Sequence, residues 1–255
     1  MNQFQKMSCS FSVVSFSFIL FLLVLGLNFT DVWPKVLQLA FLCFSLEQCS
    51  QKSDVVFVLD SSGSISRRNF KRELQFVKQV ASTFKMGPKQ SQIAVISYSN
   101  EARVDIPFGS YSNVNDFNAA LNRVKHQRQY TRIDKALDVA NTRVFTRAGG
   151  ARTGVAKVMV VLTDGKQTVT SDSKTLDDAV RPLQEKNVTV FAVGVGKAVD
   201  IQELLLLVGD NEDNVFLAED FSQLARDSLR LAAQTCQRIN LPAGKRKAVW
   251  SAFCG

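Results

Sequence analysis

The chain has 255 residues, and 46% of them are hydrophobic, which is enough apolar material for one large domain or two small ones. Its formal net charge of +8 and its pI near 9.4 favour contact with anionic surfaces such as nucleic acid, phospholipid or sulfated polysaccharide. The basic residues are scattered, and no arginine-rich block or stripe of basic and aromatic residues indicates nucleic-acid binding.

The N-terminus has the features of a secretory signal. Lys6 precedes an apolar core, Phe18–Leu27, which is short for a membrane span but suited to a signal peptide. We therefore expect a signal peptide over residues 1–26, with cleavage after Gly26, followed by an N-terminal segment over residues 27–52.

Two alternatives remain open at this end of the chain. A second apolar stretch, Val36–Leu46, leaves the cleavage point undecided. An uncleaved signal anchor over Phe11–Leu27 would attach the protein to a membrane. In both cases the globular part is delivered outside the cytosol.

Strand and helix patterns alternate through the rest of the chain. Five apolar runs, rich in β-branched residues, are typical of parallel strands covered on both faces: Val55–Leu59, Ile93–Ser97, Val158–Leu162, Val188–Val193 and Val215–Ala218. Helical periodicity is present between them, with one stripe of Phe70, Leu74, Val77, Ala81 and Phe84 and another of Ile133, Leu137, Ala140 and Val144. Further helices are predicted over Asn113–Val124, Lys174–Lys186, Ile201–Leu206 and Phe221–Cys236, with Asp200 and Asp220 as N-caps of the last two.

This alternation predicts a doubly wound, Rossmann-like α/β fold with a mostly parallel sheet and helices on both faces. Ala102–Ile106, which ends before Pro107, is predicted to be a short antiparallel edge strand. We expect one domain over residues 53–236 and a basic C-terminal tail over residues 237–255.

Oxygen-bearing side chains follow two of the predicted strands. Asp60-Ser61-Ser62-Gly63-Ser64 comes directly after the first strand, Asp164 follows the third, and Thr131 begins a predicted helix. The carboxyl ends of strands in such a sheet meet at the same edge, where ligands bind. Hard oxygen donors suit Mg²⁺, Mn²⁺ or Ca²⁺, so the pattern predicts a divalent-metal site of Asp60, Ser62, Ser64, Thr131 and Asp164. Gly63 is expected to allow a tight turn, and Gly165 a close backbone approach.

Other residues indicate the compartment and exclude other metals. The cysteines, Cys9, Cys43, Cys49, Cys236 and Cys254, bracket the predicted domain, as suits disulfides in a secreted protein. There is no Cys-x-x-Cys pair, and His126 is the only histidine, so we do not expect a Cys/His metal site. Asn187-Val188-Thr189 is a candidate N-glycosylation sequon at a predicted helix-to-strand turn.

These motifs resemble the metal-ion-dependent adhesion site of von Willebrand factor type A domains. The similarity runs from about Ser53 to Gln234, and its wording is closest to the domains of matrilins and collagen VI chains, which are extracellular matrix proteins. Many members carry a second Thr where this chain has Ile133, a position that is not a direct ligand in the family pattern. The resemblance implies that the three hydroxyls bind the metal directly, that the aspartates often act through water, and that Cys49 pairs with Cys236.

The resulting hypothesis is an extracellular matrix or cell-adhesion protein, not an enzyme, whose metal accepts an acidic residue of a collagen-like or other matrix glycoprotein. Anionic polysaccharide is a further expected partner class, nucleic acid is not, and Cys254 is a candidate intermolecular link. One alternative is a Mg²⁺-dependent hydrolase, which would need a positioned base; His126 is expected to be a solvated surface residue. Another is a structural matrix unit whose metal site is unused.

Overall fold

The structure is a computed structural model, and it describes residue 49, residues 51–209 and residues 211–240. The expected signal peptide, the alternative signal anchor, Cys9, Cys43, Cys254 and the tail beyond residue 240 lie outside these residues. Within the described part of the chain, no helix has the length and apolar character needed to cross a membrane.

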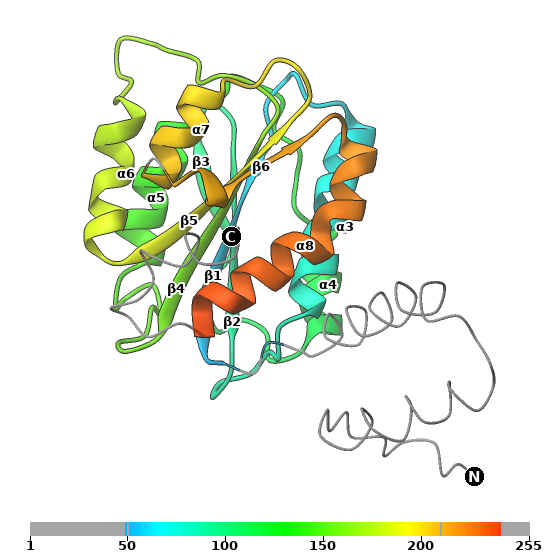
Figure 1. The fold of residues 1–255 in the computed structure, drawn as a ribbon, viewed down its shortest axis with the longest axis vertical. Helices are drawn as coiled ribbons and strands as arrows, with labels where there is room; N and C mark the ends of the chain where they lie inside the picture. Colours follow the sequence, from blue (N-terminus) through cyan, green and yellow to red (C-terminus); the bar gives the residue numbers. More distant parts are fainter. Residues whose placement is uncertain (1–48, 50, 210, 241–255) are drawn as a thin grey trace, which may run out of the picture. The chain divides into compact units, whose positions relative to one another are not determined.

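Six strands form one sheet in the order β3-β2-β1-β4-β5-β6 (Figure 1). β3 runs antiparallel to β2, and every other neighbouring pair is parallel. The strands are β1 (Ser53–Asp60), β2 (Gln92–Tyr98), β3 (Ala102–Ile106), β4 (Ala156–Thr163), β5 (Val188–Val195) and β6 (Val215–Ala218). The predicted doubly wound sheet and its antiparallel edge strand are therefore confirmed.

Helices cover both faces of this sheet. On one face lie α3 (Arg67–Ser82), α4 (Val114–Leu121) and α8 (Phe221–Asn240). On the other lie α5 (Ile133–Val139), α6 (Leu176–Glu185) and α7 (Ile201–Val208). A π-helical turn, Ala140–Val144, continues α5, and a short 3₁₀ turn, Glu212–Asn214, precedes β6.

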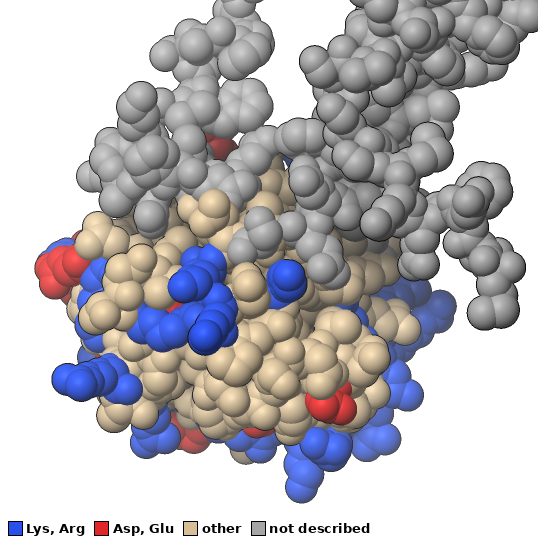
Figure 2. All heavy atoms as spheres, turned by 90° about the horizontal axis from the view of Figure 1, so that it is seen from below, with Lys and Arg blue, Asp and Glu red and all other residues tan. Residues whose placement is uncertain are grey.

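The parallel strands all point toward the same end of the domain. Their carboxyl ends lie at the upper end in Figure 1, and their amino ends lie at the lower end, which Figure 2 views from below. Loops that follow the carboxyl ends are therefore brought together, and this is the usual ligand-binding edge of such a sheet.

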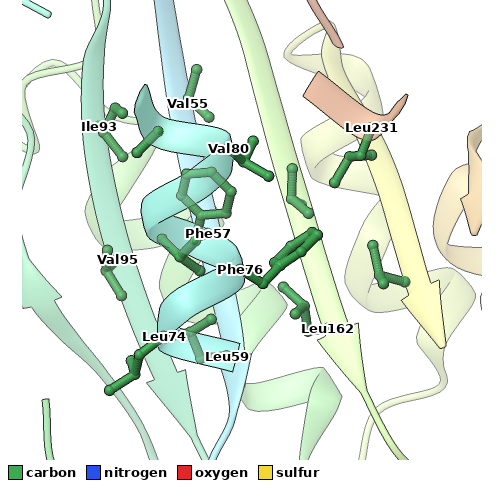
Figure 3. Close-up of a cluster of buried hydrophobic side chains, with 14 of the residues drawn as sticks. Val55, Phe57, Leu59, Leu74, Phe76, Val80, Ile93, Val95, Leu162 and Leu231 are labelled. Carbon is green, nitrogen blue, oxygen red and sulfur yellow. The ribbon is translucent and has the colours of Figure 1, made fainter. Parts of the chain in front are cut away.

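Strand β1 shows why both faces of the sheet must be covered. Its side chains alternate, so Val55, Phe57 and Leu59 pack beneath helix α3, while Val56 and Val58 pack on the opposite face. All five are fully buried. Figure 3 shows the first of these clusters, between β1 and α3. Each such side chain contributes about 1.5–3 kcal/mol by leaving water, which favours the strand at this central position.

Side-chain caps fix the starts of several helices. The Asp200 carboxylate accepts a hydrogen bond from the backbone N of Gln202, and Asp220 accepts bonds from the backbone N of Ser222 and Gln223. Both predicted N-caps are thus present. The helix ends were predicted less well, since α8 continues to Asn240, into the expected tail, and α4 stops at Leu121.

A disulfide joins the two ends of the domain. Cys49, just before β1, is bonded to Cys236 near the end of α8, with 5.6 Å between their Cα atoms. The backbone N of Cys49 also donates to the carbonyl of Thr83, 2.7 Å away, which fixes the cysteine against the end of α3. The pairing implied by the resemblance is therefore present in the structure.

Candidate metal-binding site

Asp60, the last residue of β1, lies at the base of the candidate site with no exposed surface. Its carboxylate accepts hydrogen bonds from the backbone N of Ser62 (2.9 Å), the Thr163 hydroxyl (3.0 Å) and the Tyr98 hydroxyl (3.2 Å). Burial raises the pKa of the Asp60 carboxyl to about 6; the bonds from Ser62 oppose this rise, and the charge of Asp164 adds to it.

Three of the predicted ligands touch one another in front of Asp60. The Ser62 and Ser64 hydroxyl oxygens are 2.9 Å apart, and the Ser64 hydroxyl donates to the Asp164 carboxylate at 2.7 Å. Ser62 is buried, Ser64 is exposed and Asp164 is half-buried, so the row leads from the interior to the surface. Burial raises the pKa of Asp164, and the hydrogen bond from Ser64 opposes that rise.

Backbone hydrogen bonds bring the loop before Thr131 to these residues. The backbone N of Gly63 donates to the carbonyl of Gln129 at 2.7 Å, and the backbone N of Arg128 donates to the carbonyl of Ser61 at 2.6 Å. A Cβ on Gly63 would lie 3.4 Å from the Arg128 carbonyl oxygen, which is ordinary van der Waals contact, so Gly63 packs directly against this loop. At Gly165, a Cβ would meet no atom within 4 Å, so the close approach expected there is wrong.

Thr131 is joined in turn to the loop that follows Asp164. Its carbonyl accepts a hydrogen bond from the backbone N of Thr168 (2.8 Å), and its own backbone N donates to the Thr168 hydroxyl (3.2 Å). Thr131 is 8% exposed. The five predicted ligands therefore come from three loops that hydrogen bonds tie together at the carboxyl end of the sheet.

Arg132 anchors the loop after Asp164 through ion pairs and hydrogen bonds. Its guanidinium is 2% exposed and makes two bonds of 2.9 Å to the Asp134 carboxylate and one of 2.8 Å to Asp172. The hydrogen bonds to Asp134 hold the pKa of Arg132 above its ordinary value, so its charge is permanent. This ion-paired network fixes the loop that carries Thr168.

Sequence reasoning missed two partners of Asp60 and misjudged a third neighbour of the site. Tyr98 stands opposite Asp60 in the β1–β2 register, and Thr163 is the last residue of the adjacent strand β4. Both residues lie at the carboxyl ends of strands next to β1, and this position in the sequence could have identified them as neighbours of Asp60. His126 was expected to be solvated, but it is half-buried, stacks on Phe70 with 4.7 Å between ring centroids, and contacts the carbonyl of Ser62 at 3.1 Å.

The residues present suit a hard divalent cation. The three joined loops carry two carboxylates and three hydroxyls, and burial raises the pKa of both carboxyls. A bound cation would stabilise their ionised forms. All five predicted ligands offer oxygen atoms. A different kind of site, built from three or more His, Cys, Asp or Glu side chains, is not found among the described residues. Asp60, Ser62, Ser64, Thr131 and Asp164 fit Mg²⁺ better than a Cys/His metal.

Asn187, the candidate glycosylation site, lies far from these residues along the fold. It is exposed in the turn between α6 and β5, at the amino end of that strand. Its φ of 57° places it in the left-handed region, which Asn adopts more readily than most residues.

Comparison with known proteins supports the resemblance that the sequence motifs indicate. The family model of the von Willebrand factor type A domain matches residues 54–229. Chicken matrilin-1 is 29% identical over 183 residues, which cover 72% of this chain and 36% of matrilin-1. The human collagen alpha-5(VI) chain is 31% identical over 195 residues, which cover 74% of this chain and 7% of the collagen chain. The chain thus matches only a small part of these extracellular matrix relatives.

Solved structures of proximal thread matrix protein 1 from the mussel byssus have a similar fold. One has a TM-score of 0.66, 27% identity, and coverage of 74% of this chain and 47% of the mussel protein. A second, described as having a zinc-occupied MIDAS motif, has a TM-score of 0.68 with the same identity and coverage. A divalent metal therefore binds the corresponding motif of a structural neighbour.

Proposed function

Because this chain belongs to the von Willebrand factor type A family, we propose that it is an extracellular matrix or cell-adhesion protein that binds a protein ligand through a divalent metal. The proposed metal ligands, directly or through water, are Asp60, Ser62, Ser64, Thr131 and Asp164. Its relatives are matrix proteins, which supports an extracellular location and a role in binding.

One observation carries the proposal, the contact row from Ser62 through Ser64 to Asp164, with Asp60 buried behind it. Residues 62, 64 and 164 come from two loops a hundred positions apart in sequence. An ordinary polar turn would satisfy its hydroxyls locally, with no need for a carboxylate from another strand end.

The proposed ligands contribute to cation binding in two different ways. Asp60 and Asp164 supply two negative charges, and the Ser62, Ser64 and Thr131 hydroxyls supply neutral oxygens that remove little of the ion's charge. A bound Mg²⁺, Mn²⁺ or Ca²⁺ ion would supply an electrophilic centre for a carboxylate oxygen of the partner. Tyr98 and Thr163 hold the Asp60 carboxylate in place by hydrogen bonds.

Apolar side chains beside the site are suited to contact the partner. Tyr130 is 61% exposed and Val169 is 79% exposed. Tyr130 precedes Thr131 and Val169 follows Thr168 in the sequence, so each adjoins one member of this hydrogen-bonded pair. A Glu or Asp with an apolar neighbour, on a collagen-like or other matrix glycoprotein, fits such a surface.

The hydrolase alternative finds less support at this site. His126, the only histidine, stacks on Phe70 and contacts a backbone carbonyl through its Nε2 atom. Burial lowers its pKa. Through these contacts the His126 ring packs against Phe70 and the loop that carries Ser62. We therefore propose that the protein is a binding protein and not an enzyme.

Secretion, glycosylation and assembly complete the proposal. Exposure of Asn187 in a turn supports attachment of a glycan there. A disulfide-linked oligomer through Cys254 and a membrane anchor through the N-terminal apolar segment are open alternatives for the whole protein, and both involve residues outside the described ones.

The metal assignment is tested by calorimetry on the full chain. Asp164→Ala should lose measurable Mg²⁺ binding while the sheet stays folded, because Asp164 lies in a loop. Asp177→Ala is the matched control, since it removes an exposed carboxylate from α6. Undiminished Mg²⁺ affinity in Asp164→Ala would remove these residues as ligands.

Adhesion is tested by capture from matrix extract. We expect capture of a protein in Mg²⁺ that is lost in EDTA and in Ser62→Ala. Capture that survives both treatments would leave the metal site unused and support the structural alternative.

A further inference from the structure

A hollow lined by basic side chains lies at the end of the sheet opposite the candidate metal site. Its volume is about 690 Å³, and five of its eleven lining residues are Lys or Arg, whereas none is Asp or Glu. The five are Lys52, Lys89, Arg147, Arg152 and Lys157. Figure 2 views this end of the domain, where Lys and Arg side chains gather on the surface. We call this feature the basic hollow.

Arg152 joins the segments that line the basic hollow by hydrogen bonds. Its guanidinium donates to the carbonyl of Ser53 (2.8 Å), the carbonyl of Gln90 (2.8 Å) and the carboxylate of Asp54 (2.8 Å). These bonds join the start of β1, the loop before β2 and the loop before β4. The segments that carry the other cations are therefore held in a fixed arrangement, as a binding site requires.

The positive charge of the basic hollow is largely uncompensated. Asp54, the carboxylate behind it, is fully buried and already paired with Arg152. Lys52, Lys89 and Arg147 are exposed, and none forms an ion pair with another described residue. Like charges brought together in a recess raise the local potential and attract anions.

We propose that the basic hollow binds a sulfated polysaccharide chain, independently of the metal site. Its cations surround a recess, so they can engage several sulfate groups of one linear polymer at once. This proposal does not depend on the proposed adhesive function, because no metal-binding residue lines the hollow.

Three observations favour a sulfated polysaccharide over other polyanions. Among the described residues, none of the exposed large apolar side chains lines the hollow, and such side chains are the ones that insert into a lipid surface. Its one aromatic residue, Phe145, is 3% exposed and presents no face on which a nucleic-acid base could stack. The matrix location of the relatives also favours polysaccharide, since anionic lipid is concentrated on the cytoplasmic leaflet.

The test measures binding of the full chain to a heparin oligosaccharide in EDTA at physiological salt. Lys52→Glu combined with Arg147→Glu should weaken binding at least tenfold, by removing two attractive contacts and adding two repulsive ones. The matched control is Arg68→Glu combined with Lys71→Glu, which changes net charge equally at exposed positions of α3. The control should stay within about threefold of the unchanged chain.

Each outcome decides the proposal. Equal losses of heparin affinity in the two charge-reversal variants would show attraction to net charge alone and would overturn the proposal.

The neutral pair Lys52→Gln and Arg147→Gln, with thermal unfolding measured alongside, separates a loss of sulfate contacts from a loss of folding. Desulfated heparin should bind weakly; equally tight binding to it, to phosphatidylserine vesicles or to duplex DNA through the same residues would also overturn it. Because EDTA is present throughout, failure here says nothing against the metal site.

Discussion

Glu73 is a carboxylic acid buried within the apolar face of helix α3. It has no exposed surface, and neither carboxyl oxygen has a hydrogen-bond partner among the described residues. Burial raises the pKa of Glu73 well above its ordinary value of 4.5, and the charges of Asp60 and Asp164 raise it further. The group is therefore neutral in the native state at a pH where it is ionised in the unfolded chain.

This difference predicts a loss of stability as pH rises. Between the unfolded pKa of 4.5 and the raised native pKa, the native state binds more protons at Glu73 than the unfolded state. The contribution of Glu73 to the free energy of unfolding therefore falls in this window, by up to about 1.4 kcal/mol per pH unit. Glu73→Gln, which cannot ionise, should lack this decline. Urea unfolding in EDTA at pH 5 and pH 7 measures it, and the unchanged chain should lose more stability over this interval than the variant.

Asp60 and Asp164 provide the comparison within that experiment, because burial is the main cause of their raised pKa values and Glu73→Gln should leave that burial in place. Their effect cancels in the difference between chain and variant. Equal pH curves for the two proteins would mean that Glu73 is ionised in the native state, contrary to its burial.

The sequence predicted the ligand residues but not what surrounds them. Asp60 and Asp164 could be placed at one edge because each follows an apolar strand in a parallel sheet. Contact of Tyr98 with Asp60 depends on the β1–β2 register, which local patterns do not give. The burial of Glu73 was missed for another reason. Its position, three residues after Phe70 and four before Val77, lies on the apolar stripe of α3, but a carboxylic acid is expected at the surface.

Among the secondary-structure elements, strands were predicted better than helices. Each apolar run is continuous because its strand is covered on both faces, and such a run identifies the position of the strand in the sequence. The apolar stripe from Ile133 to Val144 predicted one helix, whereas the structure has α5 followed by a π-helical turn, Ala140–Val144. All four residues of the stripe are buried, so side-chain packing was predicted correctly while the backbone hydrogen bonding was not.

The disulfide between the start of β1 and α8 should contribute strongly to stability. It closes a segment with a sequence separation of 187 residues, for which chain entropy gives about 5 kcal/mol, less any strain in the folded state. Cys49→Ser combined with Cys236→Ser should lower the urea midpoint accordingly. The unchanged chain in reducing agent is the matched control and should unfold at the same midpoint as the variant. Peptide mapping that pairs Cys49 with Cys43 or Cys254 would contradict the connectivity.

At the scale of the whole molecule, the candidate metal site and the basic hollow occupy opposite ends of one sheet. Strand β1 runs between them, with Asp60 at its carboxyl end and Lys52 just before its start. Its eight residues span about 26 Å at 3.3 Å per residue. Charges this far apart are separated by about three Debye lengths at physiological salt, where that length is about 8 Å.

The two sites should therefore act independently, and one domain could bridge a protein and a polysaccharide. We expect Lys52→Glu combined with Arg147→Glu to leave Mg²⁺ affinity within about twofold, because distant sites contribute additively. Asp164→Ala should conversely leave heparin affinity unchanged within about twofold. Calorimetry with Mg²⁺ and with a heparin oligosaccharide on each variant, and on the two combined, forms a double-mutant cycle. A coupling of tenfold or more would show that the ends of the sheet communicate, so that ligands at one end would regulate binding at the other.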